Sequence, residues 1–136
     1  MAGLMIHLLI ADKVYNRRSL LYYIGSIAPD AVSGWKNKDI THYRTVTDRN
    51  AALSNLAVNT SPSDDFAEGM LLHLYTDWRW DELVMCKFIK KEGADWLTKY
   101  RHELACSSSY AYYNTPWAKD IWNEMHQCDV SNYGDV

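Results

Sequence analysis

The chain has 136 residues, of which 48% are hydrophobic, and this balance favours a folded domain with its own core over a disordered chain. The 17 acidic residues outnumber 14 basic ones, and the net charge of −3 argues against nucleic-acid binding through a basic patch. Cys86, Cys106 and Cys128 lie far apart without a C-x-x-C pair, so the sequence indicates neither a disulfide framework nor a cysteine zinc site.

The first part of the chain is predicted to form two buried helices. The apolar residues of "LMIHLLIADKVY" predict a helix over about residues 4–15, and "RSLLYYIGSI" predicts a second one over 18–27 that ends near Gly25. Pro29 disfavours a helical residue before it and predicts a turn. Asp30 is therefore expected at the edge of a loop, just after a buried helix.

A loop and two helices are predicted next. Residues 33–46 are polar and aperiodic, which is typical of a loop, whereas residues 47–58 form a helical pattern that begins at Thr47 or Asp48. From Ser63 to about Lys91 the chain lacks proline, so we expect one long helix there, with a bend around residues 78–81.

The last third of the chain is predicted to form helices over 94–106 and about 115–127, with a loop, "CSSSYAYYNT", between them. Pro116 is expected in the first turn of the second helix. The aromatic stretch "YAYYNTPWAKDIW" is compatible with a substrate cleft or with loop and core packing. The fold class is thus an all-α bundle of five or six helices in a single domain, residues 1–136. Without a signal peptide or an apolar span, we expect a cytoplasmic protein with no transmembrane segment.

The stretch "GMLLHLYTDWRW" places two polar side chains in an otherwise apolar helix. His73 and Asp77 are four residues apart and share one face, and Asp81 continues that line by another turn. A buried carboxylate needs compensation, which a His–Asp hydrogen bond would provide. The alternative is a divalent metal, zinc above all, which imidazole and carboxylate on one helical face bind well.

A metal needs ligands from other segments, and three residues could supply them. His7 lies in the apolar first helix, Asp30 follows Pro29, and His42 lies in "DITHYR" within the expected loop. Each alone is commonly structural. With His73 and Asp77 they make three histidines and two carboxylates, enough for one tetrahedral site or for two metals that share a carboxylate.

These segments resemble a known family. In order, "MIHLLIADKV", "YYIGSIAPDAV", "THYR" and "GMLLHLYTDWRWDE" are similar to the pattern of zinc-dependent phospholipase C-like hydrolases, a superfamily that includes the S1/P1-type nucleases. The similarity covers roughly residues 3–82 well and the rest loosely. It implies a phospholipase C/P1 nuclease-like fold and cleavage of a phosphoester, with a small phosphoester or a phospholipid-type molecule as substrate.

The resemblance also implies roles for the five residues. His42, His73 and Asp77 match the ligands of one zinc ion, His7 matches a ligand of a second zinc that shares Asp77, and Asp30 matches the acid beside the metal-bound water. Asp30 is therefore both a metal-site and a catalytic residue in this interpretation. Zinc at such a site lowers the pKa of bound water to about 7 and stabilises negative charge in the transition state.

The chain departs from the family pattern in its second half. Three-metal members carry a later H-x-x-x-E and an N-terminal tryptophan whose amine binds metal, whereas this chain starts "MAGLM" and neither His102 nor His126 has Glu four residues later. We therefore expect one or two zinc ions, or another divalent metal.

Two alternatives were open at this point. Relatives of this kind are longer, so the chain is either a natural short form or lacks a C-terminal portion. The alternative function is a degenerate, non-catalytic metal-binding or interaction module of the same fold. Helical HD-type phosphohydrolases are disfavoured because the chain has no adjacent His-Asp pair.

Overall fold

The computed structural model describes residues 2–15 and 19–130, and in these ranges it contains helices and turns but no strand. The predicted all-α class is confirmed. Among the described residues, five helices have ten residues or more: α1 (Leu4–Tyr15), α4 (Arg49–Asn59), α5 (Asp65–Trp80), α7 (Trp96–Asn114) and α8 (Ala118–Gln127). The shorter α-helices are α2 (Leu20–Gly25), α3 (Trp35–Thr41) and α6 (Cys86–Glu92). Five of the predicted helices correspond to the longer set, and the one predicted over 18–27 corresponds to α2.

Several helix starts follow the capping residues that the sequence offers. Asp48 caps α4 by accepting a hydrogen bond from the amide of Ala51 at 2.9 Å, and Asp64 caps α5 in the same way with Ala67 at 3.0 Å. Helix α1 has the predicted bounds, and α2 falls within the predicted 18–27, although Arg18 lies outside the described residues.

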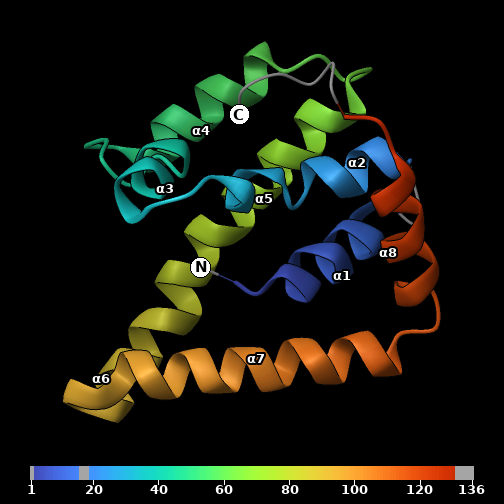
Figure 1. Ribbon diagram of the computed structural model, residues 1–136. Helices are drawn as coiled ribbons and strands as arrows, with labels where there is room; N and C mark the ends of the chain where they lie inside the picture. The colour runs from blue at the N-terminus through green and yellow to red at the C-terminus, as the bar shows by residue number, and fades with distance from the viewer. Residues whose placement is uncertain (1, 16–18, 131–136) are drawn as a thin grey trace.

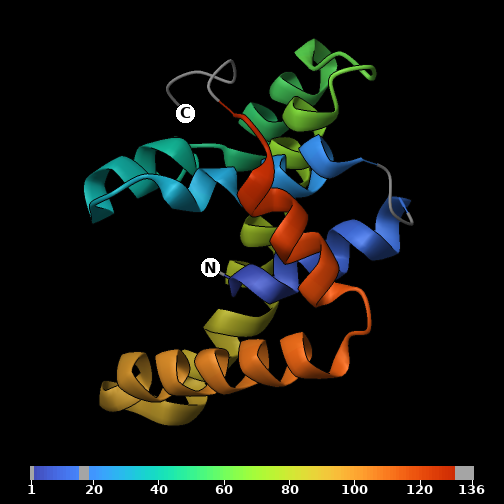
Figure 2. The same ribbon diagram turned by 45° about the vertical axis from the view of Figure 1, so that its right-hand side comes forward.

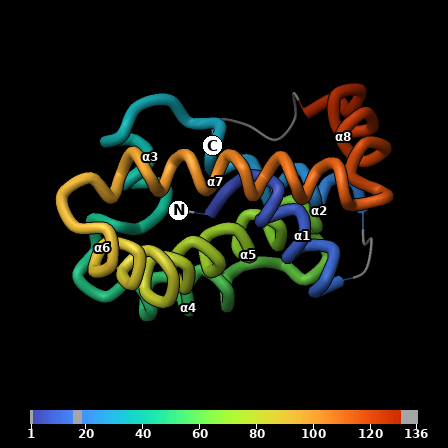
Figure 3. Tube along the Cα trace, turned by 90° about the horizontal axis from the view of Figure 1, so that it is seen from below, coloured from blue at the N-terminus to red at the C-terminus, as the bar shows by residue number. Residues whose placement is uncertain are grey.

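Two predicted loops are wrong. Residues 33–46 contain helix α3, which has 7 residues, about two turns, and is too short to leave a clear apolar period in the sequence. The serine-rich stretch after Cys106 continues α7 to Asn114, because it contains neither proline nor glycine and the helix packs along α1 (Figure 3). Pro116 lies in the turn before α8, not in its first turn.

The long helix predicted over 63–91 is present, and its irregular part lies slightly later than expected. Helix α5 continues into a π-helical turn, Asp81–Met85, and then into α6, so the chain runs helically from Asp65 to Glu92 (Figure 1). A short 3-10 turn, Gly93–Asp95, then leads into α7. Such π-helical turns are frequently found near functional sites.

The main apolar core lies between α1, α2 and α8, and Figure 2 shows α8 beside α2. Its buried members are Met5, Leu8, Ala11, Tyr22, Tyr23 and Ala118. Side chains of the aromatic stretch, including Tyr112, Trp117 and Trp122, pack against this core. For these residues core packing is the correct interpretation of the stretch. Among the described residues, no helix is long and apolar enough to cross a membrane.

Helices α2 and α5 cross with their backbones in direct contact. A Cβ atom on Gly25 would overlap the carbonyl oxygen of Phe66, and one on Gly69 would overlap that of Tyr22. Glycine is required at both positions because no side chain fits between the helices. The crossing holds the end of α2, with the carbonyl of Ser26, against the face of α5 that carries His73.

Candidate metal centre

His73 and Asp77 lie on the inner face of α5, and both side chains have no exposed surface. Their separation is 4.0 Å between Nε2 of His73 and Oδ2 of Asp77, which is too long for a hydrogen bond. The simple alternative of a buried His73–Asp77 hydrogen bond is therefore wrong. Other groups must compensate the two side chains.

Three further predicted residues converge on this pair from different elements. His42, at the C-terminal end of α3, places Nε2 at 3.1 Å from Nε2 of His73 and 3.4 Å from Oδ2 of Asp77. Asp30, in the 3-10 turn η1 (Ala28–Ala31), has Oδ1 at 3.6 Å from Nε2 of His42. His7 of α1 has Nε2 at 3.3 Å from Oδ1 of Asp77. The structure thus brings together all five predicted residues.

The donor atoms form two overlapping groups. Those of His42, His73 and Asp77 all lie within 4.8 Å of one another, and so do those of His7, Asp30 and His73. In the first group the separations are 3.1, 3.4 and 4.0 Å. Ligands about 2.0–2.2 Å from a tetrahedral zinc ion lie roughly 3.3–3.6 Å apart, so this group has close to the required spacing before any ion is placed.

Asp77 faces a different histidine with each of its carboxylate oxygens. Oδ1 is close to His7 and also accepts a hydrogen bond from the backbone amide of Ala2 at 2.7 Å, whereas Oδ2 is close to His42. A carboxylate in this arrangement can bind one ion or bridge two.

His42 reaches the cluster because of the way α3 ends. Tyr43 has a left-handed backbone conformation, with φ of 55°, and its amide bonds to the carbonyl of Ile40 while the amide of Arg44 bonds to that of Asp39. This reversal closes the helix end in the manner of a C-terminal cap. A non-glycine residue in this conformation costs roughly 1–2 kcal/mol, so the position stores strain beside the cluster.

The ring nitrogens of His42 and His73 have assigned roles. Nδ1 of His73 lies 2.8 Å from the carbonyl oxygen of Ser26, and Nδ1 of His42 lies 2.8 Å from that of Lys38. A carbonyl oxygen only accepts, so both Nδ1 atoms carry the proton. Whenever both rings are neutral, their Nε2 lone pairs face each other at 3.1 Å, and only a proton or a cation between them makes this contact favourable.

His7 is the third histidine of the cluster, and its ring nitrogens also suit a metal ligand. Its side chain is 1% exposed and stacks on His73, with ring centroids 3.8 Å apart. Within the described part of the chain, neither of its ring nitrogens has a hydrogen-bond partner, since Nε2 approaches Asp77 without bonding geometry. Buried polar atoms without partners are rare in folded proteins, and a bound water or ion is a common explanation for them.

The protonation states suit metal ligands. Burial, followed by the neighbouring His7, lowers the pKa of His73 from 6.5 to about 4, so this ring is neutral at pH 7. Burial alone would raise the pKa of Asp30, but the nearby His42 ring and the positive charge of Lys38 outweigh it and lower the pKa to about 2. Burial also opposes the charge of Asp77, yet His7 beside it holds that pKa well below its usual range.

Cationic side chains surround the cluster. Lys38 donates to Oδ1 of Asp30 at 3.2 Å, and Arg44 donates to Oδ2 of Asp77 at 3.4 Å. Arg44 also donates to Asp81 at 3.3 Å, as does Arg49 at 3.1 Å. Asp81, the third acid in the line from His73, therefore holds two arginines and does not join the metal-ligand groups of the described residues.

Sequence reasoning did not find Lys38 and Arg44 as site residues. Arg44 stands in the "THYR" segment two residues after His42, and that proximity was the available signal. His102 and His126 lie outside the cluster, His102 beside Cys106 and His126 against Trp122.

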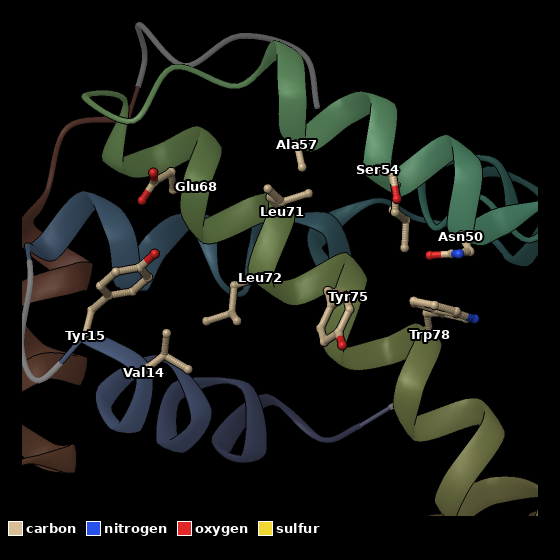
Figure 4. Close-up of a pocket in the computed structure, with 11 residues that line it drawn as sticks. Val14, Tyr15, Asn50, Ser54, Ala57, Glu68, Leu71, Leu72, Tyr75 and Trp78 are labelled. Carbon is tan, nitrogen blue, oxygen red and sulfur yellow. The ribbon is translucent and has the colours of Figure 1, made fainter.

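A hollow of about 350 Å³ lies on another side of α5, between α1 and α4 (Figure 4). Leu71, Leu72 and Tyr75 of α5 face it, together with Val14 and Tyr15 at the end of α1. None of the five cluster residues lines it. This hollow is therefore separate from the candidate metal centre.

In comparisons, no protein family, curated protein or solved structure matches the chain. The assignment to the phospholipase C-like superfamily therefore stays a prediction. The geometry of the cluster has to carry the functional argument by itself.

Proposed function

We propose that this protein is a metal-dependent hydrolase of phosphoesters, with zinc held by His7, Asp30, His42, His73 and Asp77. The observation that carries the proposal is the contact between the Nε2 atoms of His42 and His73 at 3.1 Å, with both Nδ1–H groups bonded to backbone carbonyls. Carbonyl partners of this kind are typical of metal-ligating histidines, because they fix the tautomer and the ring orientation.

A shared proton between the two rings accounts for this contact less well. The pKa of His73 is lowered to about 4, so this ring resists protonation at neutral pH. Divalent cations bound by the two ligand groups would satisfy both Nε2 lone pairs, the carboxylate of Asp77 and one of the two unpartnered nitrogens of His7. Three histidines and two carboxylates form a donor set that zinc prefers.

A zinc ion bound by these residues would lower the pKa of a bound water molecule and would stabilise negative charge on a phosphoryl oxygen. Asp30 is the most accessible member of the cluster, at 18% side-chain exposure, and it is ionised at neutral pH. It is placed to orient a water by accepting its hydrogen bond. Lys38 and Arg44 provide positive charge on either side of the cluster for an anionic ester.

A non-catalytic module is the second candidate, and one observation favours it. Four of the five residues are buried to 1% exposure or less: His7, His42, His73 and Asp77. Structural zinc sites are closed in this way, whereas catalytic sites keep a position for water or substrate. In the proposed enzyme this open position lies at Asp30.

The first test measures metal content and hydrolysis in one preparation. We expect at least one equivalent of zinc in protein purified without chelator, and hydrolysis of p-nitrophenyl phosphate or bis(p-nitrophenyl) phosphate that chelation abolishes. His73→Ala should lose zinc and activity, while His102→Ala, an exposed histidine outside the cluster, should keep both. Zinc well below one equivalent would remove the basis of the proposal.

Asp30→Asn separates the two candidates. In an enzyme, this variant should retain the zinc held by the buried ligands but lose roughly 100-fold or more in hydrolysis, because a positioned acid or base commonly contributes that much. In a structural module, wild type and Asp30→Asn should both hold zinc, and neither should hydrolyse an ester. Circular dichroism of each variant checks that the fold is retained.

A further inference from the structure

A hollow of about 260 Å³ lies next to the candidate metal centre, between α3 and α7. Most of its wall is apolar or aromatic and comes from both helices and from the π-helical turn, with Trp35, Met85, Trp96, Leu97, Tyr100 and Leu104 as the main members. An engineered apolar cavity of about 150 Å³ is known to bind benzene, so this hollow has room for a small organic group.

Arg44 connects the hollow with the cluster. Its side chain lines the hollow, and its Nη2 donates to Oδ2 of Asp77 at 3.4 Å. The Arg44 side chain is 20% exposed, and its guanidinium also approaches Asp39 at 3.6 Å and Asp81 at 3.3 Å. A guanidinium fork is well suited to hold two oxygens of a phosphoryl group.

Tyr100 lies in the same wall and is fixed there by a hydrogen bond from the indole of Trp80 at 2.7 Å. Trp80 is the last residue of α5, so this bond ties the wall of the hollow to the helix that carries His73 and Asp77. The guanidinium of Arg101, which also lines the hollow, lies 5.6 Å from the ring centre of Trp35. The hollow therefore has a mostly apolar floor, and its charged lining residues are Arg44, Arg101 and Asp39, the last of which lies 3.6 Å from Arg44.

We infer that this hollow is the specificity subsite for the organic group of the substrate, and that Arg44 holds the phosphoryl group at its boundary with the metal cluster. The substrate class is a phosphoester of a small apolar alcohol, because the walls offer mostly rings and aliphatic carbons. The inference rests on the proposed function for the position of the phosphoryl group. It goes beyond that function by naming the part of the substrate that is selected.

The test uses binding and does not need turnover. Phenylphosphonate and methylphosphonate carry the same anionic head and differ only in the organic group, so their affinities for the zinc-loaded full chain are compared by calorimetry. We expect phenylphosphonate to bind at least about tenfold more tightly, since the phenyl group leaves water for an apolar wall. Equal affinities, or no binding of either compound, would overturn the inference.

Two variants separate the roles of Arg44 and of the apolar floor. Leu97→Trp fills the hollow and should abolish the preference for phenylphosphonate without changing the affinity for methylphosphonate. Leu83→Trp is its control, because Leu83 is exposed and lies outside the hollow. Arg44→Lys keeps the charge but removes the fork and should weaken both compounds about tenfold, with Lys36→Ala on the exposed side of α3 as control. Uniform effects across both compounds and all variants would refute the assignment.

These outcomes are distinguishable from failure of the proposed function. A chain that shows the predicted binding pattern but hydrolyses no ester has the subsite and lacks the activity. A chain that hydrolyses phenyl and methyl esters equally well, with and without Leu97→Trp, has the activity and lacks the subsite.

Discussion

Replacement of Gly69 by alanine should damage both the fold and the metal centre. The new Cβ would overlap the carbonyl oxygen of Tyr22 and lie 2.8 Å from the amide nitrogen of Ser26 and 3.0 Å from the carbonyl carbon of Gly25. All three are backbone atoms, which cannot rotate away. Helix α2 must therefore move away from α5.

The expected loss of stability follows from two opposing contributions. Overpacking of this kind costs about 3 kcal/mol at the upper end of its usual range, and the higher helix propensity of alanine returns about 1 kcal/mol. A net loss of about 2 kcal/mol should lower the Tm by roughly 6–10 °C for a chain of this size. Thermal unfolding followed by circular dichroism, in the presence of a chelator, measures this change.

The same movement should reach the metal centre. It would pull the carbonyl of Ser26 away from Nδ1 of His73, now 2.8 Å distant, and the loss of such an outer-shell partner weakens metal binding about 10–100-fold. Gly93→Ala is the control, because Gly93 has φ of 66° and ψ of −138° in a conformation that only glycine adopts readily, far along the chain from the cluster. It should cost stability and leave zinc affinity unchanged. A Gly69→Ala protein that melts within about 2 °C of wild type and binds zinc equally well would refute the close helix contact.

Three other predictions concern metal, pH and strain. Chelation should lower the Tm by at least 10 °C relative to protein with free zinc at about 1,000 times its Kd, because zinc binding then adds about 4 kcal/mol to the free energy of unfolding. A Tm that is the same with and without zinc would contradict the site. The pKa of His73 falls from 6.5 in the unfolded chain to about 4 in the folded one, so the unfolded state takes up its proton first as the pH is lowered. Urea unfolding of the metal-free protein should therefore show a free energy of unfolding that decreases by about 2–3 kcal/mol from pH 6.5 to pH 4. The lowered pKa values of Asp30 and Asp77 should extend this decrease below pH 3.8, whereas a flat profile would argue against a buried neutral ring. Tyr43→Gly should relieve the left-handed backbone and raise the free energy of unfolding by about 1 kcal/mol in the same assay, and a loss of stability would show that the tyrosine side chain matters more than the strain.

The helices that the sequence predicts well are those with strong local signals. Helix α1 has an apolar pattern along its whole length, and α4 and α5 begin where Asp48 and Asp64 offer capping carboxylates. Helix α3 and the second half of α7 were predicted as loops, since short length in the first case and a run of serines in the second hide the helical pattern. Packing against α1 stabilises the second half of α7 as a helix, and the helix propensities of its residues alone do not predict this.

The candidate site shows a similar division. The five ligand types were predictable because histidine and aspartate are costly in apolar segments such as "GMLLHLYTDWRW". Their convergence from α1, η1, α3 and α5 depends on the Gly25–Gly69 crossing, which a single sequence does not reveal. Asp81 illustrates the limit, because it continues the line of His73 and Asp77 on the helix, yet its partners are Arg44 and Arg49 from other segments.

Helix α3 supplies Lys38 and His42 to the cluster, and none of the residues Trp35–Thr41 is buried. Its attachment to the rest of the molecule therefore depends largely on His42, which is fully buried at its end, with the Lys38–Asp30 ion pair and the Trp35–Arg101 contact beside it. We expect amide hydrogens of this helix to exchange rapidly with solvent in metal-free protein and slowly once zinc is bound. Zinc affinity would then include the free energy of ordering one short helix, and substitutions on its exposed face, far from any ligand atom, could tune how tightly the metal is held.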